Sequence, residues 1–81
     1  MRLRYSERFL RSYEEAPPAV QRAFDKQATL LAGNLRHPSL RAKKYNEARN
    51  LWQARVTGSW RFYFTIEGDT YLLHDVIAHP K

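Results

Sequence analysis

The first half of the chain has the spacing of apolar residues that is typical of amphipathic helices. Residues 1–5 alternate in character and predict a short first strand. Ser6 is suited to cap a following helix, because its hydroxyl can accept a bond from a free backbone amide. Phe9, Leu10 and Tyr13 then form a one-sided apolar stripe. We therefore expect a strand followed directly by a short helix.

A second helical stripe follows the pair Pro17–Pro18. The first helix must end at this pair, and Pro18 is suited to the first position of the next helix. The buried positions of the second stripe are expected to be Val20, Phe24, Ala28, Leu31 and Leu35. Gly33–Asn34 favours a left-handed residue at the helix end. Pro38 then makes a resumption of the helix unfavourable.

The second half of the chain alternates between apolar and polar positions, as strands do. The apolar positions of residues 51–57 and 61–66 are Trp52, Ala54, Val56, Phe62, Phe64 and Ile66. All have even numbers, so residues that pair in a hairpin must sum to an even number. A three-residue connection, residues 58–60, pairs Val56 with Phe62 and Arg55 with Tyr63. Arg55 and Arg61 then become diagonal neighbours on the open face of the sheet.

Residues 70–79 predict the last strand, after a turn at residues 67–69. Its phase is ambiguous, because apolar residues lie on both faces, as in a central strand. If Leu72 faces the helices, His79 shares the open face with Arg55 and Arg61. Residues 43–45 predict a short strand at the other side of the sheet.

The predicted fold class is α+β, in a single domain that spans residues 1–81. The element order is β-α-α-β-β-β, with two N-terminal helices packed on one face of a small, mostly antiparallel sheet.

The net charge of +6 is confined to one stretch, from Arg36 to Arg61. This stretch has one acid, Glu47, and seven basic residues, namely Arg36, Arg41, Lys43, Lys44, Arg49, Arg55 and Arg61. Such a concentration is typical of a surface that binds nucleic acid, and the aromatic residues between the cations could stack on unpaired bases. The alternative is an ordinary sheet edge and outer face that Lys and Arg keep soluble.

Several classes of protein are not supported by the composition. The chain has no cysteine, so disulfides and Cys-based zinc sites are excluded. Three histidines without paired acids give little support for a metal, and we expect no metal and no cofactor. No apolar run approaches the roughly 20 residues that a membrane span needs, and the N-terminus does not resemble a secretory signal. We expect a cytoplasmic protein with no membrane partner.

The order of elements, together with several short segments, resembles the RelE/ParE superfamily of bacterial toxins. The segments are Tyr5–Phe9, His37–Lys44, Leu51–Val56, Trp60–Phe64, Gly68–Thr70 and Ile77–His79. The resemblance covers essentially the whole chain, and its specificity comes from the ordered series. It implies a toxin that a co-expressed antitoxin neutralises. RelE-like members cut mRNA in the ribosomal decoding site, whereas ParE-like members poison DNA gyrase without cutting RNA.

From this resemblance we expect a ribosome-dependent mRNA endonuclease that uses the substrate 2′-OH as nucleophile. Such an enzyme must remove the 2′-OH proton, stabilise charge on the phosphate and protonate the 5′-oxygen. Many ribonuclease members carry a C-terminal Tyr, but here His79 is followed only by Pro80 and Lys81. Two alternatives therefore stay open, a ParE-like gyrase inhibitor and a degenerate toxin that retains only antitoxin binding.

The resemblance implies two catalytic arginines. Arg61 matches a family Arg near the start of its strand, and its guanidinium would clamp the scissile phosphate. The alternative is an ion pair of Arg61 with Asp75 or Glu67. Arg55 matches a second family Arg, and its alternative is a cross-strand contact with Tyr63.

Two lysines and a histidine complete the implied catalytic set. Lys43 and Lys44 match a lysine-bearing strand, but only one of two adjacent strand residues can face the site. The alternative is an edge strand protected by lysine. His79 matches a family position that supplies an acid or base, and its alternative is a surface residue on a fraying end. We interpret His74 as part of the sheet packing and Glu47 as a solvated residue.

The remaining predictions concern binding. The candidate RNA-binding residues are Arg41, Tyr45, Arg49, Trp60 and Tyr63. Trp60, in the predicted turn, would either stack on a base or cap the core. The expected partners are mRNA on the ribosome and a cognate antitoxin whose acidic, partly disordered segment folds on the basic surface. The resemblance also implies an oligomer formed through the antitoxin.

Overall fold

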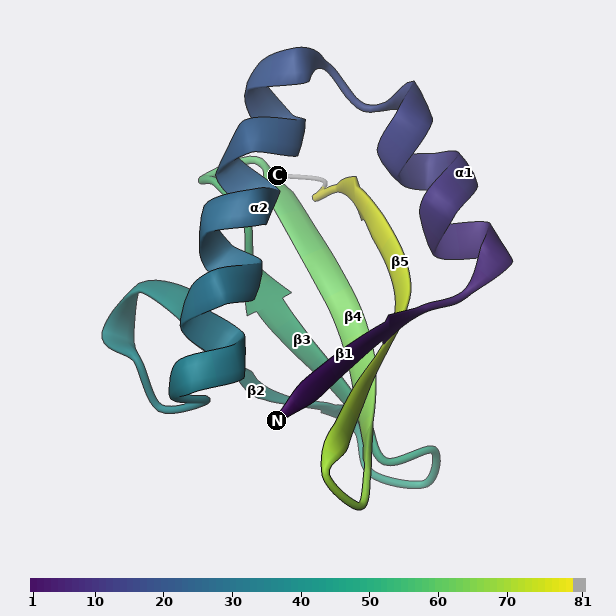
Figure 1. The fold of residues 1–81 in the computed structure, drawn as a ribbon, viewed down its shortest axis with the longest axis vertical. Coiled ribbons are helices and arrows are strands. Elements are labelled where there is room, and N and C mark those ends of the chain that lie inside the picture. The colour runs from purple at the N-terminus through teal and green to yellow at the C-terminus, as the bar shows by residue number, and fades with distance from the viewer. Residues whose placement is uncertain (80–81) are drawn as a thin grey trace.

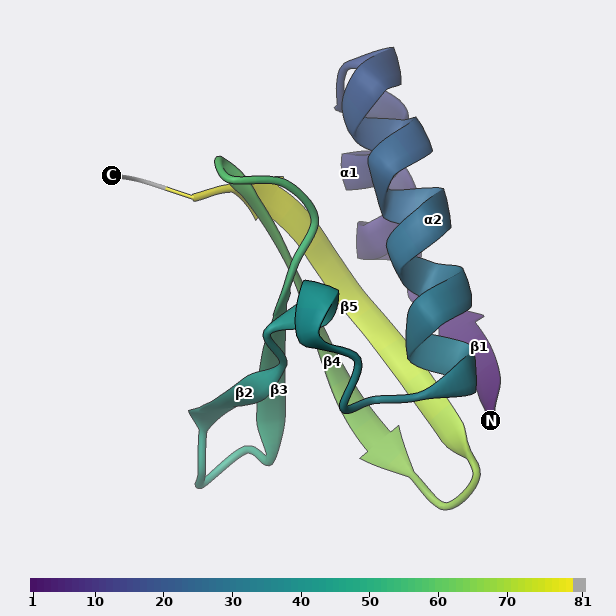
Figure 2. The same cartoon turned by 90° about the vertical axis from the view of Figure 1, so that its left-hand side faces the viewer.

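Two helices lie on one side of a five-stranded sheet in the computed structural model, which describes residues 1–79 (Figures 1 and 2). The elements are β1 (Arg2–Tyr5), α1 (Glu7–Glu15), α2 (Pro18–Gly33), the 3-10 helix η1 (Pro38–Leu40), β2 (Lys43–Asn46), β3 (Leu51–Arg55), β4 (Trp60–Glu67) and β5 (Thr70–Ala78). The strand order is β1-β5-β4-β3-β2, and only β1 pairs in parallel, with β5. The predicted α+β class is confirmed, as is the position of β2 at the far edge, and the observed order has one strand more than β-α-α-β-β-β, because β2 is a strand in its own right. No helix within residues 1–79 is both long and apolar enough to cross a membrane.

The predicted start of α1 is confirmed, but its apolar stripe is narrower than expected. The Ser6 hydroxyl accepts the Phe9 amide at 3.0 Å, as an N-cap should. Phe9 is fully buried, whereas Leu10 is 50% exposed. Consecutive helical residues are rotated by about 100°, so with Phe9 toward the core Leu10 points away from it. The prediction that Leu10 belongs to the buried stripe is wrong.

The second helix begins at Pro18, as predicted, but ends in another way. Asn34 has an extended backbone with φ −162°, so the expected left-handed closure at Gly33–Asn34 is wrong. The Asn34 amide donates to the Leu30 carbonyl at 2.8 Å, and its side chain accepts the Arg36 amide at 3.0 Å. The helix thus ends without a left-handed residue, and the Asn34 side chain pairs the Arg36 amide in a local turn.

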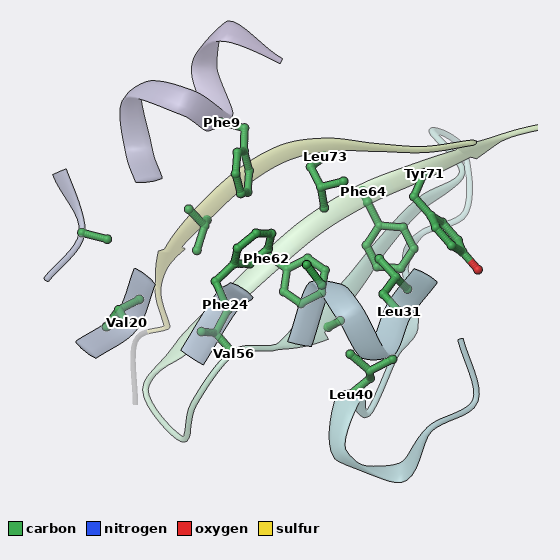
Figure 3. Close-up of a cluster of buried hydrophobic side chains, with 14 residues drawn as sticks. Phe9, Val20, Phe24, Leu31, Leu40, Val56, Phe62, Phe64, Tyr71 and Leu73 are labelled. Atoms are coloured by element: carbon green, nitrogen blue, oxygen red, sulfur yellow. The ribbon is translucent and has the colours of Figure 1, made fainter. Parts of the chain in front are cut away.

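Aromatic rings form the centre of the core between the helices and the sheet (Figure 3). The ring of Phe62 on β4 lies 5.2 Å from Phe24 on α2 and 5.7 Å from Phe64. Phe24 in turn lies 5.0 Å from Phe9 on α1. One continuous cluster therefore connects both helices to the central strand, and edge-to-face pairs such as Phe24–Phe62 add to the free energy of burial.

One buried polar side chain joins three elements. Gln27 of α2 is 4% exposed, and its Nε2 donates to the carbonyls of Ser39 at 3.0 Å and of Arg55 at 2.8 Å. Its Oε1 accepts the Ser39 hydroxyl at 3.2 Å. The amide therefore ties η1 and the end of β3 to the helix.

The hairpin of β3 and β4 differs in register from the prediction. The observed pairs are Trp52–Phe64, Gln53–Tyr63, Ala54–Phe62 and Arg55–Arg61. The residue numbers of each observed pair sum to an even number, so the predicted faces of the strands are right. The two strands are, however, offset by two residues from the expected pairing. The connecting loop spans residues 56–59, because the amides of Val56 and Thr57 both donate to the Trp60 carbonyl. Arg55 and Arg61 are therefore directly opposite each other rather than diagonal.

A β-bulge resolves the ambiguous phase of β5. Tyr63 pairs with Asp75, whereas the next residue, Phe64, pairs with Leu73, so His74 is the extra residue. Because of this insertion Tyr71, Leu73 and Val76 are all buried, although their spacing does not fit one strand phase. Leu72 does not face the helices, because its neighbours Tyr71 and Leu73 face them. The predicted condition for placing His79 on the open face is therefore not met. His79 is nevertheless two residues from Ile77 and has the same strand phase, and Ile77 pairs with Arg61.

We predict that Gln27→Leu destabilises the fold by about 2–3 kcal/mol, because two carbonyls lose their hydrogen-bond donor. Urea unfolding followed by circular dichroism measures the change. Gln21→Leu is the matched control, since this half-buried side chain makes one bond, to the Tyr13 carbonyl at 2.7 Å. It should cost about 1 kcal/mol. Equal costs for the two variants would contradict the bridging role of Gln27.

We also predict a loss of stability above pH 10 that depends on Tyr71. Burial raises the pKa of the Tyr71 phenol above its usual value of 10.0. Above this pH the unfolded chain releases the phenol proton while the folded chain keeps it, so the free energy of unfolding falls as the pH rises. Tyr71→Phe should make this fall less steep in urea titrations at several alkaline pH values. An unchanged slope would show that Tyr71 does not carry the effect.

Candidate functional site

The helices leave one face of the sheet open (Figure 2). A groove of about 460 Å³ lies against this face. Its lining residues come from all parts of this face and from α1, and they are Arg8, Tyr45, Arg49, Leu51, Tyr63, Thr65, His74, Asp75 and Ile77. We call this cavity the open-face groove. Its lining has two cations and one acid, so its charge is positive. Within residues 1–79 no group of His, Cys, Asp or Glu is arranged to hold a metal ion.

Two tyrosines form the aromatic part of the open-face groove. The rings of Tyr45 on β2 and Tyr63 on β4 meet edge to face, with centroids 5.1 Å apart. The buried Gln53 donates from Nε2 to the Tyr63 hydroxyl at 3.0 Å. The hydroxyl oxygen is thus an acceptor in this bond and keeps its own proton for donation into the groove. Tyr45 is 59% exposed and offers its ring to a ligand.

The bulge places a histidine in the same groove. His74 Nε2 lies 2.9 Å from the Thr65 hydroxyl, and the direction of this bond depends on the tautomer of the ring. The His74 carbonyl accepts the Ser6 hydroxyl at 3.2 Å. We interpreted His74 from the sequence as sheet packing, but its ring lines the groove. Histidine is the side chain that most often serves as a general acid or base in enzymes.

Asp75 closes the open-face groove on the side of α1. Its carboxylate lies 3.1 Å from Arg8 Nε and accepts the Ser12 hydroxyl and the Val76 amide. The Arg8 side chain is 75% exposed, so the ion pair adds little to stability. Its effect is geometric, since these contacts fix the carboxylate beside α1.

Arg61 holds the loop between β3 and β4. Its Nη1 donates to the carbonyls of Thr57 at 2.7 Å, Trp60 at 3.0 Å and Gly58 at 3.4 Å. Neither Asp75 nor Glu67 pairs with it, so the alternative of an ion pair is wrong. Every hydrogen bond of this guanidinium within residues 1–79 uses Nη1, which leaves Nε and Nη2 for a ligand. Its cross-strand neighbour Ile77 lines the open-face groove.

Arg55 and Arg41 lie outside the open-face groove. β2 pairs with β3 only as far as Gln53, so Arg55 stands at an unpaired edge. Its side chain lines a second cavity, together with Arg41 and residues of α2 and η1. The expected contact of Arg55 with Tyr63 is wrong, because Gln53 pairs with Tyr63 and Arg61 stands opposite Arg55.

The two lysines of β2 point to opposite faces. Lys43 pairs with Gln53 and shares the open face, whereas Lys44 pairs with Trp52. The Lys44 ammonium lies 5.2 Å from the Trp52 ring centroid and donates to Asn50 at 2.6 Å. It also lies 3.8 Å from the carboxylate of Glu47, which is 85% exposed as expected. Lys44 thus has structural partners, and Lys43 is the lysine on the side of the groove.

The other predicted binding residues are divided between the two faces. Arg49, Tyr45 and Tyr63 line the open-face groove. Trp60 is the first residue of β4 rather than part of a turn, and its half-buried side chain packs against the core. The exposed His79 donates its amide to the Ser59 carbonyl at 2.6 Å. The departure from the toxin pattern, a missing C-terminal Tyr, concerns Pro80 and Lys81. These two residues lie outside the described residues.

Sequence reasoning did not select Arg8, Thr65, His74 or Asp75 as site residues. The adjacent polar pair His74–Asp75 interrupts an otherwise apolar run, and this is the signal that could have indicated a bulge. Arg8 had no comparable signal, because its contribution depends on α1 lying along β5.

Comparison with known proteins identifies the fold. No family model matches the sequence, and no curated protein matches it closely enough to be significant. Several solved structures match in shape. An archaeal RelE–RelB complex from Pyrococcus horikoshii OT3 gives a TM-score of 0.81 at 14% identity, with 99% of this chain and 96% of that chain covered.

Two further structures agree with this result. A YoeB/ParE toxin from Agrobacterium tumefaciens gives a TM-score of 0.82 at 13% identity, with 99% and 100% of the two chains covered. A RelB–RelE antitoxin–toxin complex from Methanococcus jannaschii gives 0.78 at 17% identity, covering 93% and 88%. The shared architecture extends over nearly the whole chain in each case. The chain therefore has the same fold as these RelE and YoeB/ParE toxins.

Proposed function

We propose that this chain is the toxin of a toxin–antitoxin pair and that it cleaves mRNA on the ribosome at the open-face groove. One observation carries the proposal: on a RelE/ParE-type fold, the groove combines two tyrosine rings, a histidine and two arginines. Aromatic rings between cations suit an unpaired RNA strand, because bases stack on the rings while phosphates approach the cations. Cleavage of mRNA would place the activity in the cytoplasm.

The proposed chemistry uses the substrate 2′-OH and needs no metal. A nucleobase stacked on Tyr45 and Tyr63 would bring the neighbouring phosphate toward Arg61. The Nε and Nη2 groups of Arg61 can stabilise the negative charge that develops on this phosphate. Lys43, on the same face, adds to the attraction. His79 is the acid or base that the family resemblance implies, and His74 is the candidate that the groove itself offers.

An antitoxin is the proposed protein partner. Structures of the same fold from Methanococcus jannaschii and Pyrococcus horikoshii were solved as RelB–RelE complexes. The net charge of +6 in the present chain favours an acidic, partly disordered segment that folds on its surface. An oligomer would then form through the antitoxin rather than through contacts of this chain with itself.

A second candidate function is a ParE-like inhibition of DNA gyrase without RNA cleavage. The name of the Agrobacterium tumefaciens neighbour, YoeB/ParE, includes this type. A degenerate toxin that binds only its antitoxin is the third possibility. A single assay distinguishes them, because the purified chain either cuts mRNA in a translating extract, produces gyrase-dependent DNA breaks, or does neither.

We predict that the purified protein cuts mRNA within codons in a translating extract, with the ends mapped by primer extension. His74→Gln should lower the cleavage rate about 10²–10⁴-fold if His74 transfers a proton, and Tyr63→Leu should weaken binding of the RNA. Arg22→Ala is the control, since this exposed residue of α2 lies outside the groove. Intact mRNA together with gyrase-dependent DNA breaks would reject the proposal.

A separate prediction distinguishes the structural role of Arg61 from its proposed catalytic role. Arg61→Ala removes the donor to the carbonyls of Thr57, Gly58 and Trp60, so the amides of Val56 and Thr57 should exchange faster with solvent. Arg61→Lys can keep one of these bonds and should restore much of the protection, but it cannot provide the bidentate contact to phosphate. If Arg61→Lys restores the protection without restoring cleavage, Arg61 acts on the substrate. Recovery of both would limit Arg61 to holding the loop.

A further inference from the structure

A second cavity, of about 620 Å³, lies at the edge of the sheet where β2 stops covering β3. It opens between α2, η1 and the loop that follows β3. Its lining residues are Ala23, Lys26, Gln27, Pro38, Ser39, Arg41, Arg55, Val56, Thr57 and Gly58. We call this cavity the edge cleft. It shares no lining residue with the open-face groove.

The edge cleft is strongly and uniformly basic. Lys26, Arg41 and Arg55 line it, and no acidic residue does. The ion pairs within residues 1–79 are Arg8–Asp75 and Lys44–Glu47, so none of the three cations has an acidic partner there. Three cations around one cavity repel one another, and an anionic ligand would remove this repulsion.

The walls of the edge cleft are held by internal hydrogen bonds. Gln27, itself buried, binds the carbonyls of Ser39 on one wall and Arg55 on the other. Arg41 adopts a left-handed backbone with φ 47°, and its amide donates to the Pro38 carbonyl at 3.3 Å. Two of the three cations are thus carried on backbone whose position is fixed before any ligand binds, which lowers the entropy cost of binding.

The Arg55 guanidinium lies beside the backbone of Gly58. A Cβ at position 58 would be in ordinary van der Waals contact with Arg55 Nη2, at 3.7 Å. The hydroxyls of Ser39 and Thr57 add polar groups to the same cavity. A guanidinium fork beside an ammonium and hydroxyls is a combination that suits phosphate oxygens.

We propose that the edge cleft binds backbone phosphates of single-stranded RNA. An acidic peptide segment is the competing ligand, but a folded peptide partner needs large apolar anchors. The exposed large apolar residues of the described chain are Met1, Tyr5, Leu10, Tyr45 and Ile77, and none of them lines the edge cleft. RNA phosphates need only charge and hydrogen bonds. The inference does not depend on cleavage at the open-face groove.

The test measures how the affinity for RNA depends on salt. The probe is a fluorescein-labelled 2′-O-methyl oligonucleotide, which cannot be cleaved through a 2′-OH, and its anisotropy is followed between about 50 and 200 mM NaCl. Each phosphate contact contributes about 0.7 to the slope of log affinity against log salt for a single strand. Lys26→Ala/Arg41→Ala should therefore lower the magnitude of the slope by about 1.4.

The matched control is Arg11→Ala/Arg22→Ala, which removes the same charge from exposed helix positions outside both cavities. The control should change the slope much less, and thermal unfolding should show that both variants remain folded. Equal changes in the two variants would overturn the proposal, because the effect would then be one of general charge. The proposal would also be overturned if Lys26→Ala/Arg41→Ala left the slope unchanged but abolished binding of a poly-glutamate peptide. That result would assign the cleft to an acidic protein partner. If RNA binding depends on the edge cleft but the protein does not cleave mRNA, only the proposed function is rejected.

Discussion

The β-bulge at His74 is the constraint on which both faces of the sheet depend. The aromatic core requires apolar residues of β5 to face the helices at both ends of the strand, but Leu73 and Val76 are three residues apart and would point to opposite faces of a regular strand. One inserted residue removes this conflict. The same insertion places His74 and Asp75 side by side at the open-face groove. The packing of the core and the chemistry of the groove therefore have a common cause.

The basic surface has two parts with different geometry. The open-face groove has aromatic rings and a histidine, and its Asp75 is held by contacts from α1. The edge cleft has cations without acids, and Gln27 holds its walls. Arg55 and Arg61 are directly opposite each other on the backbone, and both guanidinium groups lie beside Gly58 of the loop that joins their strands. Like charges at a cross-strand pair repel, and an anionic ligand would reduce this repulsion.

The sequence predicted the elements and the faces of the strands better than it predicted the site. Periodicity located both helices and the even-numbered apolar face, because burial against one layer imposes these patterns. It did not give the hairpin register, since parity allows any shift of two residues. Nor did it place Arg55, whose side chain direction depends on where β2 ends. His74 was missed because a bulge breaks the periodicity on which the reasoning relied.

The hydroxyl of Ser6 has a consequence that reaches beyond capping. It accepts the Phe9 amide at the start of α1 and donates to the His74 carbonyl in the bulge. A second connection joins the two elements, since α1 also holds Asp75 through Arg8 and Ser12. Contacts at Ser6, Arg8 and Ser12 therefore couple the first helix to the bulge. A partner that binds the solvent-facing side of α1 would stabilise the shape of the open-face groove without entering the groove.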